Sequence, residues 1–185
     1  AQAEAAGHAI DQVFVPAGGG GLAIAVARGF EDPASPGTRY KKPAVHCVQP
    51  SGNDTIAGPL REGADRARSV NCTSKISGLQ VANVIDGDEA IVACRRLSGT
   101  GYLVDDQETW DVQKRLAREE GIFCEPAGAV AVAGALAAAR AGELPRDHYT
   151  VALVTGIGFK DPPSIDLMIA DMKCPMITVE QIEEQ

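Results

Sequence analysis

The chain has 185 residues, 45% of them hydrophobic and 23% charged, which is the composition of a folded globular protein. Its formal net charge of -8 and its lack of Lys/Arg runs argue against non-specific nucleic-acid binding, because such binding needs clustered cations. No apolar stretch reaches the length of a membrane span and no signal peptide is visible, so we expect no membrane partner.

The first half of the chain alternates apolar runs with helix-like patterns. In order, we expect the end of a helix, a strand, a helix, a loop and a second strand, at residues 1–10, 13–16, 22–29, 31–43 and 44–49. The second strand is almost continuously apolar, which is typical of a strand covered on both faces. Residues 55–77 are polar and rich in Arg, and this pattern predicts a segment near the surface.

The second half continues the alternation. We expect helices near residues 91–97, 106–120 and 126–141, and strands at 102–104, 122–124 and 150–154. Asp105, followed by Glu108 three residues on, is typical of a capping box at a helix start. Strands that alternate with helices predict an α/β fold of three layers, α/β/α, with a mostly parallel sheet.

Four consecutive glycines follow the first strand and lead into the first helix. Without Cβ atoms, Gly18, Gly19, Gly20 and Gly21 let backbone N–H groups converge near the positive end of a helix, which predicts a phosphate site. The loop lacks the Lys-Ser/Thr of a P-loop and the spacing of a dinucleotide fold. The alternative is a tight turn that allows close packing of helix on strand. A second glycine turn, residues 155–163, follows the last strand, so both turns should lie at the carboxyl edge of the sheet.

The cysteines and histidines are scattered. The five cysteines are at positions 47, 72, 94, 124 and 174. They form no C-x-x-C pair, and no His lies beside any pair of cysteines, so we expect no metal site. They are interpreted as buried, reduced thiols, which indicates a cytoplasmic protein. His46 lies in a strand-like run, and we interpret it as a core or strand-edge residue rather than a catalyst.

Three motifs together go beyond a general α/β fold. They are VPAGGGGL, EEGIFCEPAGA and LVTGIGFKDP, at residues 15–22, 119–129 and 153–162. In this order they resemble the C-terminal half of the fold-type II pyridoxal-phosphate enzymes, the tryptophan synthase β superfamily, which includes threonine synthase and threonine/serine dehydratase. The resemblance implies pyridoxal 5'-phosphate as cofactor, an amino-acid substrate and lyase chemistry of elimination or replacement. It also implies a partial large domain over residues 1–173 and a C-terminal tail over 174–185.

The resemblance assigns roles to seven residues. Gly18, Gly19, Gly20 and Gly21, with the amide of Leu22, would hold the cofactor phosphate, and Thr155 would place its hydroxyl against the pyridine nitrogen. Glu125 would lie near the ring or in the wall of the site. The alternative for Glu125 is an acid that favours the dipole at the start of helix 126–141. Lys160 is interpreted as the anchor of a turn.

The Schiff-base lysine of the family is missing. The family carries it before the glycine loop in a Ser-x-Lys-x-Arg context, and none of the seventeen residues before Gly18 is Lys. Ser74-Lys75 lies after the loop and lacks the Arg, so we assign no catalytic residue. We therefore expect a C-terminal, cofactor-phosphate-binding portion that is inactive alone, pairs with an N-terminal half and self-associates through an open sheet edge.

Two other classes of protein stay open. The chain could be a complete, non-catalytic module that binds a phosphorylated metabolite or a nucleotide at the glycine loop. It could also be a structural or regulatory subunit that keeps the fold without the site.

Overall fold

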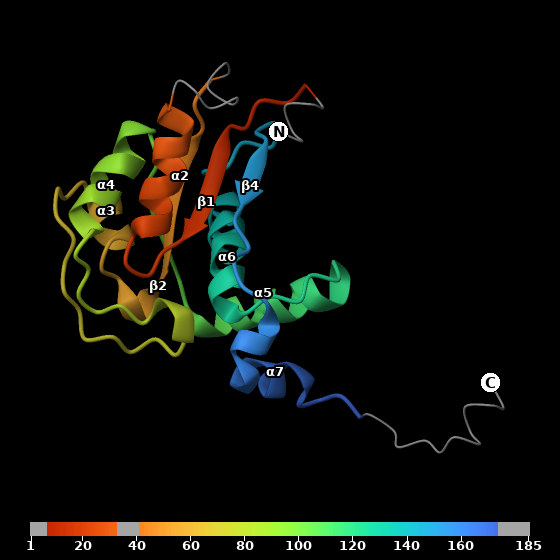
Figure 1. Ribbon diagram of the computed structural model, residues 1–185. Helices are drawn as coiled ribbons and strands as arrows, with labels where there is room; N and C mark the ends of the chain where they lie inside the picture. Colours follow the sequence, from red (N-terminus) through yellow and green to blue (C-terminus); the bar gives the residue numbers. More distant parts are fainter. Residues whose placement is uncertain (1–6, 33–40, 174–185) are drawn as a thin grey trace.

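A computed structural model describes residues 7–32 and 41–173 (Figure 1). Its centre is a four-stranded sheet with the order β3-β2-β1-β4, and every pair of neighbouring strands is parallel. The strands are β1 (Gln12–Pro16), β2 (Ala44–Pro50), β3 (Gly101–Val104) and β4 (Thr150–Ala152). The expectation of an α/β fold with a parallel sheet is therefore confirmed.

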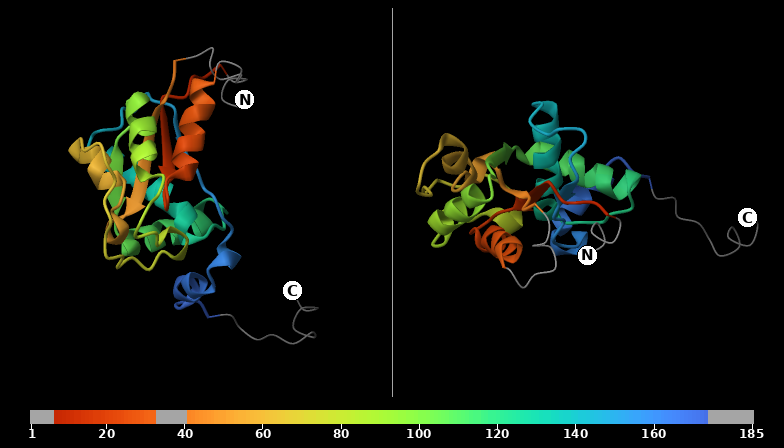
Figure 2. Two further views of the ribbon diagram at one scale, coloured as in Figure 1. Left: turned by 60° about the vertical axis from the view of Figure 1, so that its left-hand side comes forward. Right: turned by 90° about the horizontal axis from the view of Figure 1, so that it is seen from above.

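Helices cover both faces of this sheet (Figures 1 and 2). One face carries α2 (Gly21–Glu31), α3 (Ala57–Glu62) and α4 (Gly87–Arg96), and the other carries α5 (Asp106–Glu119) and α6 (Pro126–Arg140). A last helix, α7 (Pro162–Ile169), packs near α5, and three short turns are 3-10 helices, η2 (Ser51–Asn53), η3 (Ser77–Leu79) and η4 (Gly158–Lys160). The predicted three layers, α/β/α, are confirmed.

Successive side chains of a strand enter two different cores. In β1, Val13 and Val15 pack into the core under α2 and α4, whereas Phe14 packs into the core under α5 and α6. All three side chains are at most 2% exposed. Because side chains alternate between the two faces, a strand covered on both sides is apolar at every position. The continuous apolar runs in the sequence follow from this burial.

The small side chains of α6 bring that helix close to the sheet. A Cβ placed on Gly134 would lie 2.5 Å from Cγ1 of Val48, so a larger residue there would push the helix away from β2. Ala129, Val130 and Ala133 are fully buried on the same helix. The helix ends at Arg140 and Gly142 follows with φ of 72°, as expected for a helix stop at glycine.

The predicted capping box at α5 forms only in part. The Asp105 side chain accepts a hydrogen bond from the backbone N–H of Glu108 at 2.7 Å, which satisfies one free donor of the first turn. The Glu108 carboxylate does not return to the Asp105 N–H and instead pairs with Arg140 at the end of α6. The ion pair between α5 and α6 therefore replaces the second hydrogen bond of the capping box.

The expected surface segment over residues 55–77 is confirmed over residues 61–73, which are exposed or half-buried, but it is wrong over residues 55–60, which are buried at the start of α3. Ile56 and Ala57 are fully buried, and Ile76 is too. The helix start is capped by a side chain of the preceding strand β2: Oε1 of the buried Gln49 accepts the N–H groups of Ile56 and Ala57 at 2.7 and 2.9 Å. The capping side chain lies outside residues 55–77, so the local sequence pattern did not predict α3.

Smaller differences concern element ends. Residues 122–124, expected as a strand, form a single antiparallel bridge between Cys124 and Ile157, because the chain there crosses the second glycine turn instead of joining the sheet. The last strand ends at Ala152, α2 continues to Glu31, and α7 was not predicted. Residues 7–10 are not helical, while the expectations at 1–6, 33–40 and 174–185 lie outside the described residues.

The thiols are less uniform than expected. Cys47, Cys94 and Cys124 are free and buried, while Cys72 is free and half-buried, and Cys174 lies outside the described residues. Burial raises the pKa of Cys94 to about 12, which keeps this thiol protonated.

Within residues 7–32 and 41–173, no group of three or more His, Cys, Asp or Glu side chains is placed to hold a metal ion. No helix of that part of the chain is long and apolar enough to cross a membrane.

His46 is a core residue, in agreement with its interpretation as a core or strand-edge residue, and it also links β2 to β1 and to the residue before β3. Its Nδ1 accepts the backbone N–H of Thr100 at 3.1 Å, and its Nε2 lies 2.6 Å from Oε1 of Gln12. The ring packs against Phe14 and Tyr102, with ring centroids 4.7 and 5.4 Å away. Desolvation by burial lowers the pKa of His46 to about 4, so the ring is neutral at pH 7.

This burial predicts an acid-side loss of stability. The pKa of His46 is about 4 in the folded chain against 6.5 for the free side chain, so between these pH values the unfolded state binds more protons. The free energy of unfolding should therefore fall as the pH drops from about 6.5 to about 4, by on the order of 3 kcal/mol. Urea unfolding of the wild type and of His46→Asn at several pH values measures this change.

The control is His8→Asn, since His8 is exposed and stacks on Tyr149 at the surface. We expect the control to keep the wild-type pH dependence and His46→Asn to flatten it. An equal pH dependence in all three proteins would contradict the role given to His46.

Candidate functional site

A cavity of about 380 Å³ lies at the carboxyl edge of β1 and β4. It is lined by residues 16–22, Gly78, Leu79, Val81, Glu125, Ala127, Thr155 and Lys160. All seven residues that the resemblance marked for the cofactor are on this list, although they come from three separate segments. The parallel sheet brings them together because the ends of β1 and β4 are neighbours.

The glycine loop ends in an uncapped helix start. Gly20 is the N-cap of α2, no side chain caps the helix, and its first turn contains no acidic residue. The first N–H groups of a helix have no partner within it, and they carry the positive end of its dipole. The cavity is therefore bordered by backbone donors and partial positive charge, with no carboxylate in that turn to neutralise them.

The four positions of the loop are glycine for different physical reasons. Gly20 has φ of 97°, and a Cβ there would lie 2.9 Å from Cβ of Ala90. A Cβ on Gly18 would lie 3.2 Å from Val81, which is a tight contact. A Cβ on Gly19 or Gly21 would meet no atom within 4 Å. Packing and backbone conformation thus account for Gly18 and Gly20, whereas Gly19 and Gly21 keep open space beside the loop.

A buried side chain holds the root of this loop. Nε2 of Gln49 donates to the carbonyl oxygens of Ala17 and Gly18 at 3.2 and 3.4 Å, and to Oγ1 of Thr55 at 2.9 Å. The same amide caps α3 through its oxygen. The path of the glycine loop is therefore coupled to β2 and α3.

Glu125 forms part of the cavity wall and is also the N-cap of α6. Its N–H donates to the carbonyl of Gly156 at 2.9 Å, and a Cβ on Gly156 would lie only 1.8 Å from its Oε1. This carboxylate is 3.6 Å from Nζ of Lys160, whose side chain is 65% exposed, so the ion pair contributes little stability. Both interpretations of Glu125, wall residue and acid at a helix start, are compatible with this position.

Thr155 follows β4 and exposes its side chain to the same cavity. Its hydroxyl makes no hydrogen bond to another residue in the part of the chain that the structure describes. A Cβ on Gly128 would lie 3.1 Å from the Thr155 nitrogen, so the first turn of α6 packs tightly behind it. The backbone of Thr155 is held from behind while its hydroxyl stays available.

Sequence reasoning missed one wall of the cavity. Gly78, Leu79 and Val81 come from a segment for which the sequence predicts no helix or strand, and the glycine is the only local signal there. Nδ2 of the buried Asn53 donates to the carbonyls of Leu79 and Val81 at 2.8 and 3.0 Å and so fixes the wall. Ala127 completes the lining from the start of α6.

Lys75 is not part of the site. Its backbone N–H donates to Oδ2 of Asp106 at 2.6 Å, its side chain is exposed, and it does not line the cavity. Lys160 is the one lysine on the lining within residues 7–32 and 41–173. It sits in η4, beside the turn that it was expected to anchor.

The fold and this cavity match one class of protein. A family profile described as "Pyridoxal-phosphate dependent enzyme" matches residues 2–156, and the chain belongs to this family. The chain is 33% identical over 153 residues to threonine synthase of Methanocaldococcus jannaschii, a match that covers 82% of this chain and 38% of the relative. It is 27% identical over 180 residues to threonine synthase of a Bacillus species, covering 96% of this chain and 47% of the relative.

Solved structures agree with this assignment. The processed form of threonine deaminase isoform 2 from Solanum lycopersicum superposes with a TM-score of 0.67 and 28% sequence identity, over 88% of this chain and 42% of that one. The fold-type II resemblance is thus confirmed. The chain spans less than half the length of the curated relatives described above.

The glycine loop allows a test that separates its members. Gly20→Ala should lower the free energy of unfolding by about 2 kcal/mol, because an L side chain at positive φ is strained and this one meets Ala90. Gly19→Ala, one residue away and in open space, should change it by no more than about 0.5 kcal/mol. Urea unfolding measures both values, and equal losses would contradict the division of the loop into packed and open glycines.

Proposed function

We propose that this chain is the cofactor-phosphate-binding portion of a pyridoxal-phosphate enzyme of the threonine synthase or threonine deaminase type. One observation carries the proposal. Three motifs far apart in the sequence line one cavity, and that cavity borders an uncapped helix start with two open glycines. Family membership supports the cofactor, and the relatives named threonine synthase and threonine deaminase support an amino-acid substrate.

The phosphate group is assigned to the backbone of the glycine loop. The N–H groups of Gly19, Gly20, Gly21 and Leu22 lie at the start of α2, where its dipole favours an anion. The missing Cβ atoms of Gly19 and Gly21 leave space for the phosphate oxygens. Gly18 and Gly20 contribute by keeping the loop in place against Val81 and Ala90.

The ring of the cofactor is assigned to the space between the other walls. When bound, pyridoxal phosphate supplies an electron sink for elimination and replacement reactions of an amino acid. The Thr155 hydroxyl is the proposed partner of the ring nitrogen, and as a neutral group it does not hold a proton there as a carboxylate would. Glu125, Ala127 and Leu79 also line this part of the cavity, and Leu79 adds an apolar contact.

We propose that the chain alone binds the cofactor without turnover. Lys160 is largely exposed and ion-paired with Glu125, which does not suit a lysine that must attack the cofactor aldehyde. The lysine is assigned to an N-terminal portion of the enzyme, which would complete the site by association. A nucleotide or another phosphorylated metabolite at the glycine loop is the alternative ligand.

The test is a titration with pyridoxal phosphate followed by absorbance, with inorganic phosphate as competitor. We expect saturable binding that phosphate displaces and that Gly19→Val weakens by more than about tenfold, because the new side chain fills the phosphate space. The matched control is Gly29→Val, which lies within α2 at a position where a Cβ also meets no atom within 4 Å. Gly29→Val should bind like the wild type.

The same samples test whether the chain alone forms a Schiff base or has lyase activity. Borohydride reduction and peptide mapping should find no specifically labelled lysine, and serine or threonine should release no ammonia. Stoichiometric labelling of Lys75 or Lys160 would contradict the absence of a catalytic lysine. Tight nucleotide binding without pyridoxal-phosphate binding would favour the non-catalytic module.

We also propose that the chain associates with itself through the side that carries β4 and α7. The short β4 pairs only with β1 among the described strands, so its outer edge offers free backbone groups. Exposed apolar side chains lie on the following turn and helix, with Ile157 53%, Phe159 73% and Leu167 57% exposed. Light scattering should give a mass above that of one chain, Phe159→Ser should lower it, and a monomer at high concentration would contradict the proposal.

A further inference from the structure

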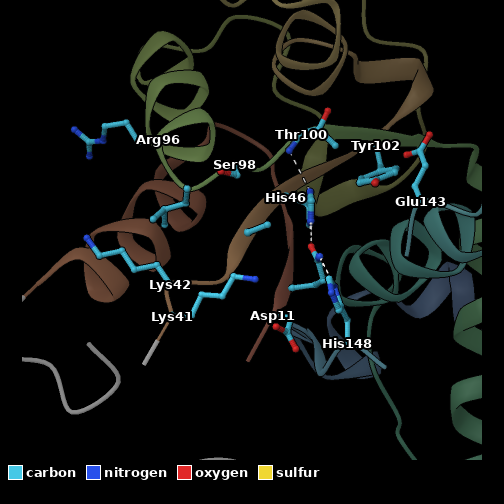
Figure 3. A pocket seen from close by; sticks show the side chains of 13 residues that line it. Asp11, Lys41, Lys42, His46, Arg96, Ser98, Thr100, Tyr102, Glu143 and His148 are labelled. Carbon is cyan, nitrogen blue, oxygen red and sulfur yellow. Dashed lines mark hydrogen bonds between the residues drawn. The ribbon is translucent and has the colours of Figure 1, made fainter. Parts of the chain in front are cut away.

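A second cavity, of about 580 Å³, lies at the opposite edge of the same sheet (Figure 3). It is bordered by the starts of β1 and β2 and by the segments that lead into β3 and β4. None of its lining residues is shared with the glycine-loop cavity. Nothing in the three sequence motifs points to this end of the molecule, so any ligand here is separate from the cofactor.

The floor of this cavity is a chain of hydrogen bonds whose direction can be deduced. The backbone N–H of Thr100 can only donate, so Nδ1 of His46 accepts and the neutral ring carries its proton on Nε2. That proton goes to Oε1 of Gln12 at 2.6 Å, which places the Gln12 amide nitrogen toward Nδ1 of His148 at 2.9 Å. His148 therefore accepts at Nδ1 and keeps a proton on Nε2, as a donor at the cavity.

Two of the charged groups at this cavity are already neutralised. Arg96 pairs with Glu31 at 2.6 Å, and Glu143 pairs with Arg61 at 2.6 Å through two nitrogens. The Arg61–Glu143 pair also lies against the ring of Tyr102, with the guanidinium carbon 5.2 Å from the ring centroid. These four residues therefore leave no net charge for a ligand.

The remaining charge is positive. Lys41 and Lys42 line the cavity, and neither forms an ion pair with another residue that the structure describes. Asp11 is the one further charged side chain on the lining, and its Oδ2 already accepts the N–H of Tyr149 at 3.0 Å. Figure 3 shows the two lysines on one side of the cavity and His148 on the other. Among the described residues, two cations without an ion pair therefore lie at this cavity, although the protein has a formal net charge of -8.

We propose that this cavity is a second ligand site, for a small anion that carries a carboxylate or phosphate group. The anion is held between the ammonium groups of Lys41 and Lys42 and the Nε2–H of His148. Charged donors form strong bonds to such oxygens, and the hydrogen-bonded floor holds His148 in the donor form before the ligand arrives. The site faces away from the glycine loop, so it does not rest on the cofactor assignment.

The histidines are the reporters for the test. The chain has three, at positions 8, 46 and 148, so their ring signals in nitrogen-15 NMR are readily assigned by substitution. His46 and His148 should both show the pattern of a neutral ring protonated at Nε2. Titration with inorganic phosphate and, separately, with malonate should shift the His148 signal saturably. Both titrations are done in the Gly19→Val background, so that binding at the glycine loop does not contribute.

Charge-matched variants decide the outcome. The double variant Lys41→Gln, Lys42→Gln should weaken binding of the anion by more than about tenfold. The control double variant Arg66→Gln, Lys173→Gln removes two exposed cations elsewhere and should leave anion binding unchanged. Binding of both probes indicates a general anion site, and binding of one alone identifies its carboxylate or phosphate preference. The proposal is overturned by non-saturable shifts with both probes, by equal weakening in the two double variants, or by a His148 ring protonated at Nδ1.

Discussion

The glycine loop and the start of α3 both depend on the hydrogen bonds of the fully buried Gln49 amide. Its nitrogen donates to the carbonyls of Ala17 and Gly18, and its oxygen accepts the N–H groups that open α3. A buried amide of this kind must have all its partners, because an unpaired polar group away from water is costly. One side chain at the end of β2 thereby fixes where the glycine loop leaves β1 and where the covering helix begins.

The loop held in this way combines two properties of glycine. At Gly18 and Gly20 the residue is required by close contact or by a left-handed backbone, and there the protein itself fills the space. At Gly19 and Gly21 neither reason applies, and the space beside the backbone stays open. A loop built only for packing would need the first pair alone. The second pair is what makes a ligand at the start of α2 the better physical explanation.

The two cavities follow from the polarity of a parallel sheet. All strands run the same way, so the carboxyl ends meet at one edge, with the glycine loop and Thr155, and the amino ends meet at the other. At the first edge the donors are backbone groups at a helix start. At the second edge the proposed donors are the side chains of Lys41, Lys42 and His148, and His148 is held through Gln12 by the buried His46. The same topology therefore accounts for the two chemically different anion sites that we propose.

The sequence by itself determined the parallel three-layer fold, because apolar runs and glycine turns are local signals that survive without tertiary context. The family resemblance of its three motifs pointed to the seven residues now found around one cavity. Only the tertiary structure decided that α3 is buried, that Glu108 turns to Arg140, and that Gly78, Leu79 and Val81 form a wall. The cap of α3 comes from Gln49, seven residues before Ile56, but a side-chain hydrogen bond of this kind leaves no pattern in the sequence. The other two depend on partners far along the chain, the end of α6 and the buried Asn53. The hydrogen-bonded floor under the second cavity has the same origin, since Gln12, His46 and His148 meet only when three strands start side by side.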